Sequence, residues 1–262
     1  MKVNYLKSLF VAVLAVTISS CEKKAETIEN SADRLAASIT NIVYPLNGND
    51  MSMNILPKKE NLPDAKLTKD ASYLKNKVKL IDLICEEYLE GTKKLDISKL
   101  KEGEFSKRIR ANDLTINFSQ EIGTGGDGFV KLDHGPNRWW AHWNYTPYTE
   151  SEYPSVLFAA NRNGSVNNTF DLTFDRKLTT FGFDVAPNGL GEEFEVWVNY
   201  QEESWYRQPN MIEVRQTISS PSGARLIAVK SQIPFQRVAI QVRATTGKAG
   251  VAIANIRYAV AK

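Results

Sequence analysis

The sequence predicts a mainly β protein, with a jelly-roll-like antiparallel β-sandwich preceded by a short helical N-terminal region. Composition changes near residue 112: all five tryptophans and nine of the eleven phenylalanines come after it. From there to the C-terminus, short hydrophobic segments alternate with polar residues, and Gly, Asn, Pro and Ser separate them. A segment of about 150 residues is an ordinary size for one domain, so we expect the β-sandwich to span 112–262.

The strands are predicted from a period of two residues. Phe170, Leu172 and Phe174 alternate with polar residues, and the same alternation returns over 194–200 and 238–242. The pair Arg176-Lys177 is interpreted as a turn between two strands. The expected strands are 113–118, 129–132, 156–159, 170–174, 178–185, 194–200, 211–218, 224–229, 238–242 and 251–260. Short, evenly spaced strands of this kind are typical of sandwiches and jelly rolls.

The N-terminus is typical of an export signal. Lys2 and Lys7 precede an apolar stretch over 9–18, which is shorter than the ~20 residues that a membrane-spanning helix needs. Ile18-Ser19-Ser20-Cys21 then resembles a bacterial lipobox. We therefore expect residues 1–20 to be a lipoprotein signal peptide, Cys21 to carry acyl chains such as palmitate, and 21–30 to be a tether. The alternative is an ordinary signal peptide with a chance cysteine.

These segments predict an exported protein that is anchored to a bacterial membrane, at the outer membrane or cell surface. Acyl chains on Cys21 anchor the chain because each buried methylene contributes ~0.8 kcal/mol. After cleavage, 31 basic and 30 acidic residues remain, because residues 1–20 hold two lysines and no acid. Such a balance provides no basic field for a phosphate backbone, so nucleic acid is not an expected partner.

Residues 31–111 are predicted as a helical and linker region. Apolar residues at three- and four-residue steps indicate helices over 31–43 and 70–90, the second ending at Gly91, with a linker over 50–66. Cys85 lies in the second helix and is expected to be a buried free thiol. An amphipathic helix needs a surface to pack on, and the β-sandwich, the other helix and a protein partner are all open as that surface.

Several segments of the β region resemble the exported jelly-roll domains found in PEP-CTERM-associated extracellular proteins, which are similar to carbohydrate-binding sandwiches. The segments that carry this resemblance are 154–158 (PSVLF), 170–175 (FDLTFD), 180–185 (TFGFDV), 233–238 (IPFQRV) and 251–258 (VAIANIRY). The resemblance implies a jelly-roll fold over roughly 113–260. It also implies a structural Ca²⁺ near the last strand, where this chain has Ala254 in place of an acid and Asn255 as a possible oxygen ligand.

Residues 133–148 form the outstanding feature of the sequence, with three tryptophans and both histidines between two predicted strands. Pro, Gly and Asn indicate a loop, and loops at the rim of a sandwich often bind ligands. Flat aromatic faces stack on sugar rings while polar side chains contact the hydroxyl groups. The candidate glycan-binding residues are Arg138, Trp139, Trp140, His142, Trp143, Asn144 and Tyr145, together with Trp197. The alternative is that the loop closes one end of the sandwich with its tryptophans buried.

Trp197 has two interpretations of its own. It lies on the polar phase of strand 194–200, beside Glu195 and Asn199. A tryptophan there either belongs to a face that grips a chain-like ligand or is covered by the N-terminal helices.

No catalytic constellation emerges from the sequence. His134 and His142 lack a zinc-type spacing and a third ligand, and Gly123–Gly128 lacks the Lys-Ser/Thr of a phosphate loop. The pairs Glu192-Glu193 and Glu202-Glu203 are adjacent in turns, which indicates solvated surface charge. We therefore expect a non-enzymatic protein without a cofactor, most simply a binder of polysaccharide or envelope glycan. The alternatives are a structural or protein-interaction module that uses helices 31–43 and 70–90, and a glycan-active enzyme.

Overall fold

A computed structural model describes residues 66–67, 77–111, 113–119, 128–133, 148–151, 153–160, 167–187, 193–202, 211–219, 224–244 and 250–262. The predicted signal peptide, tether, helix 31–43 and loop residues 138–145 lie outside the described residues. Within these ranges, thirteen strands belong to one antiparallel sheet, so the predicted mainly β class is confirmed. No helix in the described ranges is long and apolar enough to cross a bilayer.

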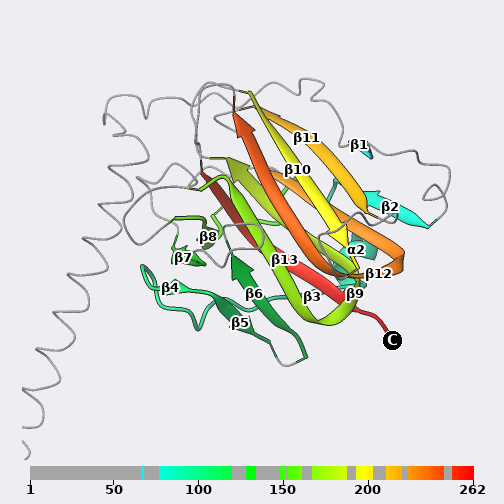
Figure 1. The fold of residues 1–262 in the computed structure, drawn as a ribbon, viewed down its shortest axis with the longest axis horizontal. Coiled ribbons are helices and arrows are strands. Elements are labelled where there is room, and N and C mark those ends of the chain that lie inside the picture. The colour runs from blue at the N-terminus through cyan, green and yellow to red at the C-terminus, as the bar shows by residue number, and fades with distance from the viewer. Residues whose placement is uncertain are drawn as a thin grey trace, which may run out of the picture.

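The elements follow one another from β1 near residue 66 to β13 at the C-terminus (Figure 1). They are β1 (Lys66–Leu67), β2 (Val78–Ile81), α2 (Glu86–Glu90), β3 (Lys93–Lys94), β4 (Phe105–Ser106), β5 (Arg108–Arg110), β6 (Thr115–Ser119), β7 (Phe129–Leu132), β8 (Val156–Phe158), β9 (Thr169–Pro187), β10 (Glu193–Gln201), β11 (Ile212–Ser219), β12 (Arg225–Ala244) and β13 (Val251–Val260).

Two long strands divide the sheet into two layers. β9 has 19 residues and β12 has 20, and the two pair along most of their length with register shifts on either side of Phe235. The first half of β9 and the second half of β12 join β10, β11, β6 and β5, which we call the Trp197 layer. The other halves join β2, β13, β8, β7 and β4, which we call the Asp184 layer.

This continuity corrects one prediction. Arg176 and Lys177 do not form a turn, because they lie inside β9, and the segments expected at 224–229 and 238–242 are both parts of β12. Leu172 pairs with Val238 before the bend and Leu178 with Phe235 after it. Both charged residues are exposed, so the chain bends with polar side chains facing water and keeps its sheet pairing.

The core lies between the two layers. Phe194, Val196 and Val198 from β10 meet Phe181 and Phe183 from β9 in one hydrophobic cluster, all with 0–1% of their surface exposed. Aromatic rings from both layers meet at Tyr200 and Phe235, whose centroids are 5.1 Å apart. The period-two pattern therefore predicts the buried face correctly in β10, where each even-numbered residue from Phe194 to Tyr200 points inward.

The predicted helix over 70–90 is wrong over most of its described length. Val78–Ile81 is the strand β2, which pairs with residues 228–231 of β12, and helix is confined to the five residues of α2. The alternating exposure of Val78 and Lys79 suits an edge strand, and the unpaired edge of β12 supplies its hydrogen bonds. The expected end at Gly91 is confirmed, whereas Cys85 is exposed at the N-cap position and is not a buried thiol.

β structure also begins earlier than the expected boundary near residue 112. Strands β2, β3, β4 and β5 all precede that residue and pair with β12, β13, β7 and β6. Residues 77–111 therefore contribute four strands to the sheet.

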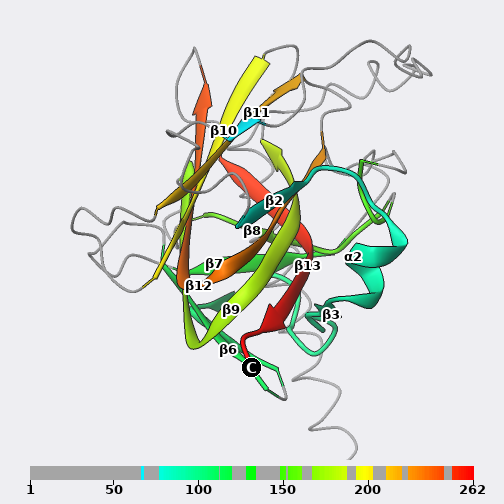
Figure 2. The same cartoon turned by 90° about the vertical axis from the view of Figure 1, so that its right-hand side faces the viewer.

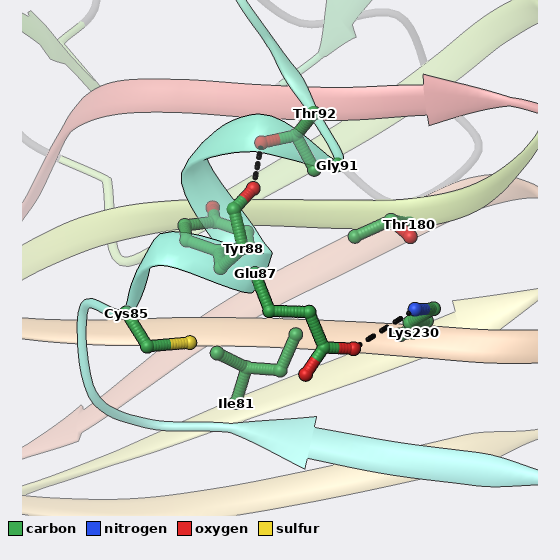
Figure 3. A pocket seen from close by; sticks show the side chains of 8 residues that line it. All are labelled: Ile81, Cys85, Glu87, Tyr88, Gly91, Thr92, Thr180 and Lys230. Atoms are coloured by element: carbon green, nitrogen blue, oxygen red, sulfur yellow. Dashed lines mark hydrogen bonds and ion pairs between the residues drawn. The ribbon is translucent and has the colours of Figure 1, made fainter.

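Helix α2 packs on the outer side of the Asp184 layer, beside β13 (Figure 2). Tyr88 is 2% exposed and lies over Gly182, where an added Cβ would overlap both the Tyr88 hydroxyl and Ala228. Figure 3 shows the residues around a space of about 20 Å³ under the helix, and Glu87 pairs there with Lys230 at 3.1 Å. This space holds one water molecule at most, so it is not a ligand site.

Candidate functional site

The predicted aromatic loop has only its two ends within the described residues. Asp133, at its start, accepts a hydrogen bond from Ser155 Oγ at 2.6 Å. Tyr148, at its end, lies under the Arg225 guanidinium at 3.9 Å and accepts a hydrogen bond from the Leu226 backbone N–H at 2.7 Å. Both ends are therefore attached to the Asp184 layer.

A pocket of about 410 Å³ lies beside β13 and is lined by residues from 94–98, 151–157 and 254–256. Three serine hydroxyls, an amide, an ammonium and a carboxylate line it, together with six apolar residues. The polar residues are Lys94, Asp96, Ser98, Ser151, Ser155 and Asn255. Ser155 joins the pocket to Asp133, and Ser151 follows closely after Tyr148. The volume is within the ~300–1,000 Å³ usual for small-ligand sites.

Asn255 owes its position in this pocket to a β-bulge in β13. Ala254 pairs with Asp184 and Arg257 pairs with Gly182, so two residues of β13 lie opposite one residue of β9. Asn255 has φ of 46°, a left-handed conformation that asparagine tolerates better than most residues. The bulge turns the Asn255 amide toward Asp184, and its Nδ2 donates to Asp184 Oδ2 at 2.8 Å and to Ser151 Oγ at 3.0 Å.

Asp184 is a fully buried carboxyl group behind the pocket. Its Oδ2 accepts hydrogen bonds from Asn255 and from the Glu150 backbone N–H at 2.9 Å, while Oδ1 is buried without a partner. Burial raises the pKa of Asp184 to about 7, against the lowering effect of the Asn255 and Glu150 hydrogen bonds. The carboxyl is thus held in place without a cationic partner.

Arg257 ties the surrounding segments together. Its Nε donates to Glu150 Oε2 at 2.7 Å, and its NH1 donates to the Leu89 carbonyl oxygen at 3.0 Å. Lys94, which lines the pocket, pairs with the other Glu150 oxygen at 2.9 Å. Burial raises the pKa of Glu150, but hydrogen bonds from Arg257 and Lys94 outweigh it, so this pKa lies below its ordinary value. The loop, α2 and β13 therefore meet in one charged network beside the pocket.

Trp197 lies on the outward face of the other layer. Its strand β10 lies between β11 and β12 (Figure 1). The guanidinium carbons of Arg215 from β11 and Arg243 from β12 are 3.5 Å and 3.4 Å from the ring centroid of Trp197, so each neighbouring strand places a cation on the indole. Its Nε1 is buried without a hydrogen-bond partner. Because the arginines stack on the ring, Trp197 is not an open platform for a sugar in this arrangement.

The same outward face also carries a buried ion pair. Arg237 Nε donates to Asp171 Oδ1 at 2.6 Å, and Arg237 NH2 pairs with Asp171 Oδ2. Both side chains are less than 10% exposed. On the Trp197 face, the Arg237 side chain is thus buried in an ion pair, whereas the Arg243 side chain is exposed to solvent.

The described residues offer no metal centre of the usual kind, since no group of three or more His, Cys, Asp or Glu comes together there. Asn255 directs its amide nitrogen at Asp184, so the two do not present paired oxygens to a cation. The calcium implied by the resemblance does not fit this geometry. His134 and His142 lie outside the described residues.

Sequence reasoning named Trp197 and Asn255 but missed the residues around them. Arg215 and Arg243 had a usable signal, because arginines on the polar phase of adjacent strands lie beside a tryptophan on the same phase. Ser98 and Ser151 had none, because their approach to Asn255 depends on the path of two loops.

The comparisons give no family for this chain: no family model matches it, and no curated protein matches its sequence. Among solved structures it is similar to the enzymatically active domain of bacteriophage CBA120 tailspike protein 4, with 14% identity, a TM-score of 0.28 and coverage of 57% of this chain. The chain spans 20% of that protein's length. It is also similar to CBM29_1, a family 29 carbohydrate-binding module from Piromyces equi, with 14% identity, a TM-score of 0.28, and coverage of 57% of this chain and 92% of the module. Likenesses this distant assign no function.

Proposed function

We propose that this protein is a non-catalytic binding module of the jelly-roll type, and that the pocket at Asn255 binds part of a neutral glycan. The observation that carries the proposal is the lining of the pocket, where three serine hydroxyls and an amide alternate with apolar side chains. Hydroxyl groups both donate and accept hydrogen bonds, as sugar hydroxyls do, and apolar side chains suit the C–H faces of a sugar ring.

The site is prepared before a ligand arrives. Both hydrogens of the Asn255 amide are used by Ser151 and Asp184, which leaves its Oδ1 as an acceptor. Lys94 forms an ion pair with Glu150. The Ser98 backbone N–H donates a hydrogen bond to Asp96 Oδ1 at 2.9 Å, which fixes the position of Ser98. Polar groups fixed in this way lose little conformational entropy on binding, which favours affinity.

Charge in the lining supports a neutral ligand. Asp96 brings one negative charge and Lys94 one positive charge, and the latter is already paired with Glu150. The lining therefore has no unpaired cation that would select an acidic sugar.

The test places a large side chain at the edge of the pocket. Ser98 is exposed and lines the pocket, whereas its neighbour Lys99 is exposed and does not. Ser98→Phe should weaken binding to a neutral polysaccharide at least tenfold, and the matched control Lys99→Phe should bind like the parent chain. Affinity gel electrophoresis with dextran, xylan, laminarin and galactomannan measures this. Binding to none of them, or equal binding by Ser98→Phe, would refute the proposal.

We further propose that the chain is exported and held at a membrane by acyl chains on Cys21. The lipobox-like Ile18-Ser19-Ser20-Cys21 after a short apolar stretch supports this. In a bacterial host, radiolabelled palmitate should enter the parent chain and not Cys21→Ser, while Cys85→Ser should be labelled normally. Labelling of Cys21→Ser would contradict lipid attachment at this residue.

A further inference from the structure

Arg243 stands out on the Trp197 face because, among the described residues, the polar partner of its guanidinium is the neutral Gln241 side chain and not a carboxylate. Its Nε and NH2 groups reach Gln241 Oε1 at 3.4 Å and 3.3 Å, which are long hydrogen bonds to a neutral acceptor. Glu195 lies opposite Arg243 in the register of β10 and β12, yet the guanidinium stacks on the indole ring.

Arg215, on the other strand beside Trp197, is different. Its NH2 pairs with Glu213 at 3.0 Å and its Nε donates to the same carboxylate oxygen at 3.1 Å. One guanidinium on the ring is therefore neutralised by an acidic neighbour, and the other is exposed and available to an anion.

Stacking makes Arg243 a better anion site than a free surface arginine. The indole fixes the plane of the guanidinium, whose N–H groups form a fork that matches the two oxygens of a carboxylate. A cation above an aromatic ring is also attracted by the ring electrons, so the guanidinium retains this orientation when no anion is bound.

We infer that the Trp197 face is a second binding site, at which Arg243 takes the carboxylate group of an acidic sugar. The site is separate from the pocket at Asn255, because no residue that lines the pocket belongs to β10, β11 or β12. It does not depend on the proposed neutral-glycan function. The carboxylate would contact the free N–H groups of Arg243 and replace the long contact with Gln241.

Indole resonances measure this directly. In ¹H–¹⁵N spectra of the full chain, the Trp197 signal is the one that disappears in Trp197→Phe. Addition of galacturonate or polygalacturonate should shift it saturably, and dextran at the same mass concentration should not. Arg243→Gln should weaken the interaction at least tenfold, because it removes a charge-assisted bidentate contact.

Arg108 provides the matched control. It is an exposed arginine on the outward face of the same layer, and its Nε donates to an amide oxygen, that of Asn117, at 2.8 Å. Arg108→Gln removes the same charge and should leave the affinity unchanged. Equal losses in Arg108→Gln and Arg243→Gln, or none in Arg243→Gln, would overturn the inference.

Two further variants separate the causes of a loss. Arg243→Lys keeps the charge without the planar fork, and full affinity in this variant would contradict bidentate recognition. Ser98→Phe should bind polygalacturonate normally, so a failure of the pocket proposal leaves this result intact.

Discussion

Among the described residues, the outward face of each layer buries one aspartate, and the two carboxyl groups are stabilised in different ways. On the Trp197 layer, Asp171 is 5% exposed and meets the Arg237 guanidinium through two oxygens. On the other layer, Asp184 is 0% exposed and meets an amide and a backbone N–H, with one oxygen unpartnered. A full opposite charge accompanies the first carboxylate, whereas only dipoles accompany the second.

The difference shows how partner choice sets the behaviour of a buried acid. A guanidinium offsets the desolvation of a carboxylate by a direct charge interaction, but each member then depends on the other. Dipoles offset less, and burial accordingly raises the pKa of Asp184 to about 7. The Trp197 layer thus contains a closed ion pair, and the Asp184 layer contains a group that titrates near neutral pH beside a pocket residue.

Removal of Arg237 should have the largest effect on stability. Arg237→Met leaves Asp171 buried without its cation, and breaking such a pair costs about 3–5 kcal/mol of unfolding free energy. Urea unfolding at pH 7 measures the loss.

The double variant Arg237→Met with Asp171→Leu is the control for that loss. It removes both charges and should recover most of the stability, because an apolar pair of similar volume often replaces a buried ion pair. A loss below about 1 kcal/mol in the single variant would show that Asp171 is solvated when alone.

Asp184→Asn should raise the unfolding free energy at neutral pH, whereas Arg237→Met lowers it, and the effect of Asp184→Asn should depend on pH. The pKa of Asp184 rises from 3.8 to about 7 on folding, so the folded chain binds a proton more tightly than the unfolded chain. The parent chain therefore loses stability as pH rises between these values, by on the order of 4 kcal/mol in total. The asparagine variant lacks this titration and should become the more stable chain above pH 7.

Urea unfolding of both chains at several pH values between 4 and 8 tests that prediction. The difference between their unfolding free energies should grow with pH and level off above about 7. A difference that is constant across this range would mean that Asp184 does not titrate there in the folded chain.

The sequence predicted the bounds of several strands well. In β7, β10 and β13 the expected and observed bounds agree within one residue. Alternating side chains specify the core face of β10, whereas β7 is buried throughout and β13 over most of its length. β9 and β12 were each predicted as two strands. In the sequence, Arg176-Lys177 and Pro234 resemble breaks between strands. In the structure, β9 and β12 pair with each other on both sides of the bend, so each continues as one strand.

The helix predicted over 70–90 shows the limit of periodicity. Val78 and Ile81 are three residues apart, which fits a helix, but both also lie in the four-residue strand β2. Short apolar segments fit either a helix or a strand in this way. Here the edge of β12 provides backbone hydrogen bonds for the segment, which is therefore a strand.

The candidate site was predictable only in part. Trp197 was identified from its polar phase, and Asn255 from a resemblance that implied calcium. Its contact with Asp184 joins residues 71 positions apart and requires the bulge, which alternation alone does not reveal. Ser98 and Ser151 reach the pocket through loops, so no local pattern marks them.

The central claim is that the pocket at Asn255 binds a neutral glycan, and the most direct measurement compares Ser98→Phe with Lys99→Phe on the polysaccharide panel. The account predicts that one glycan class retards the parent chain and Lys99→Phe equally and that Ser98→Phe migrates freely. Equal retardation of all three chains would place the glycan elsewhere and contradict the claim.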